Sequence, residues 1–173
     1  YADYDYISTA KELAGISVSG KSLLVCDLDL GGASWTPIHT FSGIFDGGGH
    51  TISNLKGGSR SDFIDKGSYA VAYAGCFAYI NEGEIKSVVF DNLTISASAV
   101  QQTNGGREFS VGGVVGLNKN IISDVGVIRS NVFGYLEHEK DQNGSPFQRV
   151  WVGGIVADNF KIVKKCYVKD SEI

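Results

Sequence analysis

The chain has 173 residues and a formal net charge of −4, and hydrophobic residues make up 43% of it. No apolar run approaches the roughly 20 residues that a membrane helix needs, and the only lysine cluster, between residues 161 and 169, is predicted to be a solvated face rather than a nucleic-acid-binding surface. With 23 glycines and two prolines, the composition predicts many tight turns.

The N-terminal residues predict a short helix followed by a strand. Thr9-Ala-Lys-Glu12 matches a capping box, and Gly15 suits the end of a helix. We expect this helix, over residues 9–14, to cover the first edge of a β-structure, because an uncovered sheet edge is prone to aggregate. In residues 24–30 apolar and polar side chains alternate, which predicts a half-buried strand with an acidic outer face.

An internal repeat is the strongest signal in the rest of the chain. Three copies run from a glycine through a short apolar strand to an asparagine, and then to a second strand with alternating apolar residues. The glycines are Gly75, Gly113 and Gly154, with one residue inserted in the first copy, and the asparagines are Asn81, Asn118 and Asn159. Successive asparagines lie 37 and 41 residues apart, which is too far for a meander of tight hairpins.

A looser copy over residues 43–55 precedes these three. Stacked copies place like residues about 4.8 Å apart, and the alignment predicts the ladders Ile52/Ile85/Ile122/Val163 and Leu55/Val88/Val125/Cys166. One copy cannot bury its own apolar face, whereas stacked copies share a continuous core. The sequence therefore predicts an all-β fold, a right-handed parallel β-helix (solenoid) with a short N-terminal capping helix, as a single domain over residues 1–173.

The copies are longer than one coil of a β-helix needs, and the excess falls in two polar stretches, near residues 96–110 and 133–149. Insertions in solenoids map to the surface, so both stretches are predicted as loops. The second loop region carries four aromatic residues, Phe133, Tyr135, Phe147 and Trp151. Aromatic surfaces beside amides suit a glycan or a protein partner. The favoured interpretation is that these side chains pin the loop onto the coil, because Trp151 directly precedes a repeat.

The final repeat continues to Ile173 with no capping signal. We therefore expect the chain to be part of a longer protein, or a second copy to cover this end through end-to-end self-association. Cys26, Cys76 and Cys166 have neither zinc-site nor disulfide spacing and are predicted to be buried, unreactive thiols.

Several polar residues are candidates for a site, but the sequence predicts no catalytic, cofactor-binding or metal-binding role for any of them. His50 follows three glycines, but no nucleophile and orienting acid lie near it in sequence, so a hydrogen bond to its own turn is favoured. His39 and His138 lie in predicted turns or loops without metal-binding spacing. Asp27, Asp29 and Asp46 offer oxygen ligands for Ca²⁺, yet alternating outward aspartates are more often solvated.

Several segments resemble known bacterial sequences. The opening of GLUG-motif proteins is similar to four segments of this chain, residues 7–13, 24–30, 35–38 and 41–55. The GLUG motif itself resembles residues 111–118 and 152–159. The resemblance implies a right-handed β-helix in large exported bacterial proteins. These include adhesins and lipoproteins of gut Bacteroides-type bacteria and the non-catalytic repeat regions of immunoglobulin A1-cleaving metallopeptidases. Cys76 and Ala157-Asp158 depart from the usual motif.

We therefore expect a non-catalytic module of a bacterial cell-surface or secreted protein, an adhesin or scaffold that binds a glycan or a cell-surface protein outside the cell. Two alternatives remain: a carbohydrate-active β-helix enzyme (lyase or hydrolase), and an accessory repeat region of a large surface metallopeptidase. The enzyme needs carboxylates clustered with lysine or arginine on one face, and the sequence offers only Lys165 and Lys169 near Asp170 and Glu172. No cofactor and no nucleic-acid partner are predicted.

Overall fold

The computed structural model describes residues 2–31, 33, 35–57, 64–66, 69–100, 107–137 and 148–173. These residues form 19 strands in four sheets and one short helix. The strands pair in parallel, except that β7 (Ile64–Lys66) runs antiparallel to β8 (Tyr69–Gly75). None of the described helical residues forms a segment long and apolar enough to cross a membrane.

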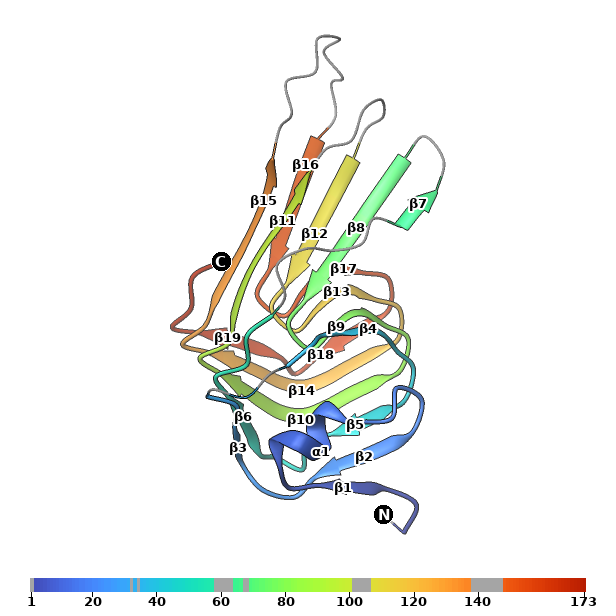
Figure 1. The fold of residues 1–173 in the computed structure, drawn as a ribbon, viewed down its shortest axis with the longest axis vertical. Helices are drawn as coiled ribbons and strands as arrows, with labels where there is room; N and C mark the ends of the chain where they lie inside the picture. The colour runs from blue at the N-terminus through green and yellow to red at the C-terminus, as the bar shows by residue number, and fades with distance from the viewer. Residues whose placement is uncertain are drawn as a thin grey trace.

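Two sheets form the walls of the coils (Figure 1). The larger contains β1 (Asp5–Ile7), β2 (Lys21–Leu24), β3 (Leu28–Asp29), β5 (Ile44–Asp46), β6 (Thr51–Ser53), β10 (Glu84–Asp91), β14 (Ile121–Ile128), β18 (Ile162–Lys164) and β19 (Tyr167–Lys169). The smaller contains β4 (Ile38–Phe41), β9 (Ala78–Asn81), β13 (Val115–Asn118) and β17 (Val156–Asn159). The chain visits the sheets in the same order in each later copy, so the fold is the parallel β-helix that the sequence predicts.

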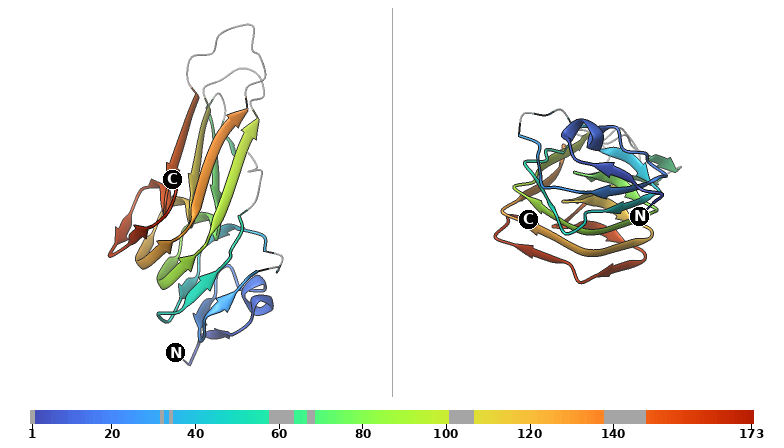
Figure 2. Two further views of the ribbon diagram at one scale, coloured as in Figure 1. Left: turned by 90° about the vertical axis from the view of Figure 1, so that its left-hand side faces the viewer. Right: turned by 90° about the horizontal axis from the view of Figure 1, so that it is seen from below.

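Two further sheets extend away from the coils, as Figures 1 and 2 show, and we call them the projecting sheets. One pairs β11 (Thr94–Val100) with β15 (Asn131–Glu137). The other contains β7, β8, β12 (Arg107–Gly112) and β16 (Gln148–Gly153). Their inner faces pack together. Gly134 of β15 lies so close to Val111 and Val150 of the other sheet that an added Cβ would be 2.6 Å from Val111 Cγ2 and 3.1 Å from Val150 Cγ1.

The predicted surface loops near 96–110 and 133–149 are therefore partly wrong. Strand β11 continues to Val100 and β12 starts at Arg107, while β15 continues to Glu137 and β16 starts at Gln148. The polar residues of these strands, such as Ser96 and Ser98, alternate with buried residues such as Ala97. Small alternating side chains gave the stretch a loop-like composition, although stacked neighbours pair it as strand. Residues 101–106 and 138–147 lie outside the described residues.

Helix α1 (Ala10–Ala14) confirms the predicted capping helix. Thr9 is its N-cap: the Glu12 amide donates to Thr9 Oγ1 at 3.2 Å, and the Thr9 amide donates to Glu12 Oε2 at 3.0 Å. The same carboxylate accepts from the Ser8 amide, and these bonds lower the pKa of Glu12. Leu13 is buried in the core, so α1 rests on the first coil, as the right-hand view of Figure 2, seen from below, shows.

The predicted ladders are confirmed in the later copies. Ile85 lies beside Ile122, which lies beside Val163, and Val88 lies beside Val125. The three glycine-to-asparagine copies also match without an inserted residue, because Gly112 pairs with both Gly75 and Gly153. This register corrects the predicted alignment, in which Gly75 was placed opposite Gly113.

The ladders are wrong in the first copy, which is offset. Phe45 lies beside Ile85, and Ile52 lies beside Phe90. Leu55 precedes a bridge between Lys56 and Thr94, so it belongs to the row of Leu93 rather than that of Val88. The cause is a turn at residues 47–50 that interrupts the first copy where β10 is continuous, and Gly48 and Gly49 in it adopt φ of +61° and +82°.

An asparagine row marks one corner of the coils. Asn81 Nδ2 donates to Asn118 Oδ1 at 2.8 Å, and Asn118 Nδ2 donates to Asn159 Oδ1 at 2.8 Å. Asn81 and Asn118 are fully buried. Each side chain also bonds the backbone two residues ahead, as when the Gly83 amide donates to Asn81 Oδ1 at 3.1 Å. The row therefore fixes both the local turn and the stacking of one coil on the next.

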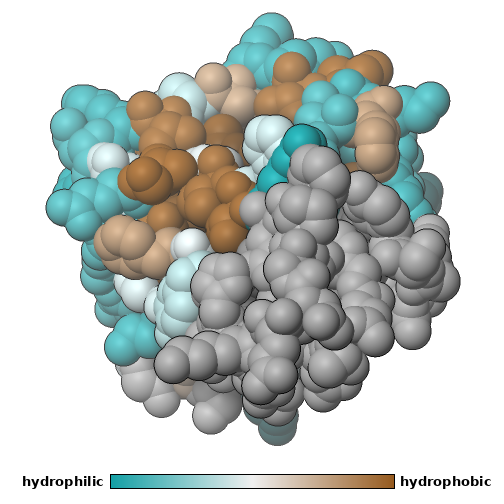
Figure 3. All heavy atoms as spheres, turned by 90° about the horizontal axis from the view of Figure 1, so that it is seen from above, coloured by the Kyte–Doolittle hydropathy of each residue, from teal (hydrophilic) through white to brown (hydrophobic). Residues whose placement is uncertain are grey.

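The last coil, residues 148–173, supplies the end strand of three sheets. Among its described side chains several large apolar groups are exposed: Trp151, Val152, Phe160, Ile162, Tyr167, Val168 and Ile173. Hydrophobic side chains gather in a patch beside the residues drawn in grey in Figure 3. The end-to-end self-association expected at this coil stays a prediction.

The three cysteines do not share one environment. Cys76 is fully buried, and burial raises the pKa of its thiol. Cys26 and Cys166 are only partly buried, so the expectation that all three are buried is wrong for these two. Both thiols donate to backbone carbonyls, Cys26 to Ser8 and Cys166 to Lys164, and stay partly accessible to water.

This difference predicts two classes of thiol. A maleimide at neutral pH is expected to modify Cys26 and, more slowly, Cys166 in the native protein, and Cys76 only after unfolding. The thiolate is the reactive form, and burial raises the pKa of Cys166 and, in the fully buried Cys76, also keeps the reagent out. Peptide mass spectrometry with and without denaturant measures this. Modification of Cys76 at the same rate in both conditions would contradict the prediction.

Candidate functional site

The four aromatic residues singled out in the sequence do not form one cluster. Phe133 and Tyr135 lie on β15, Trp151 lies on β16, and Phe147 lies outside the described residues. Because Gly134 and Val150 face the interior between the projecting sheets, their strand neighbours point outward in opposite directions. Phe133 and Tyr135 therefore share one outer face of the projection, and Trp151 belongs to the other.

None of the three described aromatics pins a loop onto the coil. Phe133, Tyr135 and Trp151 are strand residues that are 45%, 49% and 47% exposed. On the face of β15, Phe133 and Tyr135 lie beside Ser96 and Ser98 of β11. This face combines two aromatic rings with small hydroxyl side chains.

The face that carries Trp151 is chemically richer. The strand register places Tyr73, Ser110 and Trp151 side by side on β8, β12 and β16. Two residues earlier on β12 and β16, and therefore on the same face, Glu108 lies beside Arg149. We call these five residues, together with Asp158 of β17, the aromatic–polar face.

Hydrogen bonds and charges connect the members of the aromatic–polar face. Ser110, which is fully buried, donates from Oγ to Asp158 Oδ2 at 3.3 Å. Arg149 Nη1 lies 3.8 Å from Glu108 Oε1. Burial raises the pKa of Tyr73, and the negative charges of Asp158 and Glu108 raise it further. The Tyr73 hydroxyl thus stays protonated beside both carboxylates and is available as a donor.

Within the described part of the chain, the Trp151 indole has no hydrogen-bond or ring partner. An exposed ring held on a paired strand can stack on an apolar surface, and the surrounding carboxylates and guanidinium can bond hydroxyl groups at its edge. Sequence reasoning found Trp151 but missed Tyr73, Glu108, Ser110, Arg149 and Asp158. The signal was present: Tyr73, Ser110 and Trp151 each stand two residues before the first glycine of a repeat.

His50 has an acidic partner but no nucleophile in the described chain. Its Nδ1 lies 3.3 Å from Asp27 Oδ1, which also accepts from the Thr51 amide at 2.8 Å. No serine, threonine or cysteine side chain of the described residues bonds the other ring nitrogen. The His50 side chain therefore ties the turn at residues 47–50 to the segment between β2 and β3, in the neighbouring coil, instead of bonding within its own turn.

The aspartates weighed as calcium ligands are used separately. Asp27 bonds His50 and Thr51, Asp29 Oδ1 accepts from Asn54 Nδ2 and the Gly31 amide, and the buried Asp46 accepts from the Gly48 amide. Among the described residues, no group of three or more histidine, cysteine or acidic side chains is arranged to hold a metal ion.

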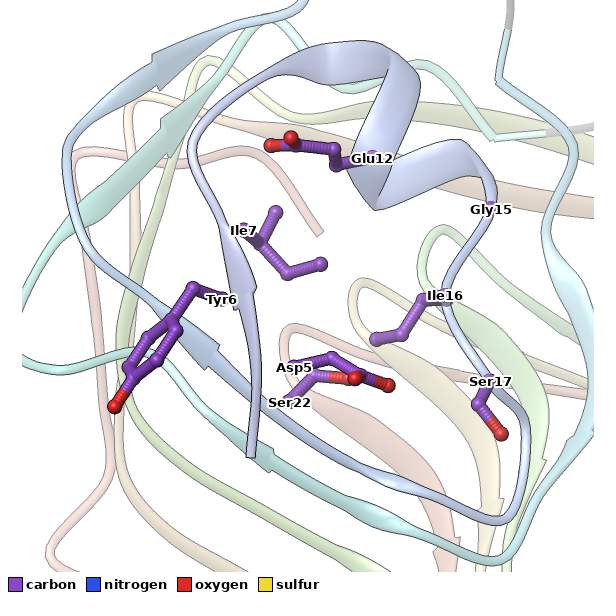
Figure 4. A pocket seen from close by; sticks show the side chains of 8 residues that line it. All are labelled: Asp5, Tyr6, Ile7, Glu12, Gly15, Ile16, Ser17 and Ser22. Carbon is purple, nitrogen blue, oxygen red and sulfur yellow. The ribbon is translucent and has the colours of Figure 1, made fainter. Parts of the chain in front are cut away.

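A shallow cavity of about 230 Å³ lies between β1 and α1 at the N-terminal end (Figure 4). Asp5, Ile7, Glu12 and Ser22 are among its lining residues. Ser22 Oγ is buried and has no hydrogen-bond partner in the described chain. Glu12 is already engaged by the helix cap, so its carboxylate stabilises the capping helix rather than serving the cavity.

No protein-family model matches the chain, so the resemblance to GLUG-motif proteins stays a prediction, and no curated protein matches it. Among solved structures the chain is similar to a crystal structure from Bacteroides ovatus described as a "putative immunoglobulin A1 protease". The sequence identity is 12% and the TM-score 0.39, over 94% of this chain and 74% of that one. A likeness of this size carries no argument about function.

Proposed function

We propose that this chain is a non-catalytic binding module of a bacterial cell-surface or secreted protein, an adhesin or scaffold whose ligand is a glycan or a cell-surface protein. The observation that carries the proposal is the placement of large aromatic side chains. Phe133, Tyr135 and Trp151 stand exposed on paired strands of sheets that extend beyond the coils. Exposed aromatics cost free energy in water and are typical of binding surfaces.

The scaffold supports the same proposal. Stacked coils with buried ladders make a rigid stem, so the projecting sheets present their outer faces in a fixed geometry. Rigid presentation lowers the entropy that is lost when a ligand binds. The extracellular location rests on the resemblance to exported GLUG-motif proteins.

The test compares binding with turnover. The purified chain is expected to bind at least one member of a panel of polysaccharides and bacterial or host cell surfaces, and to release no reducing ends or unsaturated products from the polysaccharides over a day. Product release that an acidic-to-amide substitution abolishes, for example Glu108→Gln or Asp158→Asn, would replace this proposal with the carbohydrate-active enzyme. Absence of binding to every surface and polysaccharide would refute it.

A further inference from the structure

We infer that the aromatic–polar face is a subsite for a neutral hexopyranose of a glycan, with Trp151 as its stacking platform. The inference rests on the proposed function and names the ligand class and the residues that recognise it. The three described aromatics are divided between the two outer faces of the projection, so the choice between these faces has to come from their chemistry.

A pyranose ring has an apolar C–H face and a rim of hydroxyl groups. The apolar face needs a flat aromatic surface, and the hydroxyls need both donors and acceptors at its edge. Trp151 offers the first, with half of its surface exposed and no partner within the described residues. Glu108 and Asp158 offer acceptors, and Arg149 and the Tyr73 hydroxyl offer donors.

The polar side chains of this face are held in place and keep unused hydrogen-bonding capacity. The Arg149–Glu108 pair is long, at 3.8 Å, and its two side chains are 56% and 30% exposed, so each can bond a hydroxyl without breaking a buried contact. Asp158 accepts from the buried Ser110 through one oxygen, which fixes the carboxylate and leaves acceptor capacity. Val150, the strand neighbour of Trp151, packs against the core and holds the indole's backbone in place.

The charge balance selects a neutral sugar. Glu108 and Asp158 contribute two negative charges and Arg149 one positive charge, so the face carries a net negative charge and repels carboxylated sugars. The opposite face has Phe133 and Tyr135 beside Ser96 and Ser98, and in its register no acidic residue pairs with a basic one as Glu108 does with Arg149. It therefore offers fewer paired donors and acceptors to a hydroxyl-rich ring.

The experiment measures the affinity of the purified chain for immobilised neutral glucan, galactan and mannan, beside sialylated and uronate-containing glycans. At least one neutral glycan is expected to bind with a dissociation constant in the millimolar range per site, because a single hexose presents few atoms. Trp151→Ala is expected to weaken this binding about tenfold or more, as removal of a central aromatic anchor does. Trp151→Phe, which keeps a ring on the same strand, retains most of it.

The matched control is Phe160→Ala, which removes an exposed aromatic between β17 and β18, away from the projecting sheets, and is expected to leave glycan binding unchanged. Phe133→Ala tests whether the opposite face binds the glycan instead. Circular dichroism and the melting temperature establish that each variant is folded. Binding that survives Trp151→Ala but is lost in Phe133→Ala overturns the subsite while the proposed function stands. Preference for the anionic glycans, or binding of cell-surface protein alone, also overturns it.

Discussion

Replacing Asn118 with alanine is expected to lower the free energy of unfolding by about 3–5 kcal/mol, because it leaves several buried partners unsatisfied. The side chain is fully buried at the middle of the asparagine row. Its oxygen accepts from Asn81, and its amide donates to Asn159 at 2.8 Å, to the Asn120 carbonyl at 3.1 Å and to the Ile162 carbonyl at 3.2 Å. The bonds reach two neighbouring coils, so their loss affects the whole stack.

The matched control for this substitution is Asn120→Ala. Asn120 is exposed, and its amide donates to the Glu82 carbonyl at 3.0 Å. A single exposed hydrogen bond contributes roughly 1 kcal/mol or less, so this variant should stay close to the parent. Denaturant titration followed by circular dichroism compares the two. Equal losses in both variants would show that the asparagine row does not stabilise the stacking.

Replacing Gly112 with alanine is expected to be more damaging still, at more than about 4 kcal/mol, which approaches the whole stability of a small domain. The reason is steric. A Cβ at this position would lie 1.8 Å from the Val115 carbonyl oxygen, a backbone atom that cannot rotate away. The same contact recurs at Gly75, with 2.1 Å to Ala78 O, and at Gly153, with 2.0 Å to Val156 O.

Gly15→Ala is the control for this second prediction. The nearest atom to a Cβ there is the Lys11 carbonyl oxygen at 3.6 Å, and φ is −95°, so alanine fits without strain. It is expected to leave stability unchanged or raise it by about 0.5 kcal/mol. The melting temperature and the yield of folded protein report on both variants. A Gly112→Ala protein that melts with the parent would mean that the corner between β12 and β13 is looser than the geometry implies.

Much of the coil was predictable because its signals are local and repeated. The capping box at Thr9, the spacing of Asn81 and Asn118, and the row of Ile85 and Ile122 follow from residue type and interval alone. The offset of the first copy was not predictable, since it depends on how many residues the turn before His50 inserts relative to β10. Only the pairing of distant strands reveals that number.

The candidate site was harder to predict than the coil. Trp151 is conspicuous as one of two tryptophans, but Tyr73 and Ser110 are ordinary residues whose importance comes from sharing its row. The row forms because the strands extend past the coil, and that extension was hidden by small and polar side chains. Phe133 and Trp151 separate because they lie on different projecting sheets, whose outer faces point away from each other.

The register of the projecting sheets also explains the unequal repeat. Val100, the last residue of β11, lies beside Glu137, the last residue of β15, and the first residues of β12 and β16, Arg107 and Gln148, also lie side by side. Residues 101–106 connect β11 to β12, whereas residues 138–147 connect β15 to β16. The second connection is four residues longer, which is the whole difference between spacings of 37 and 41 in the asparagine row. The paired strands thus keep one register in both coils, and only the connections between them differ in length. The chain therefore differs in length between these strands without a shift in the pairing of the strands that flank them.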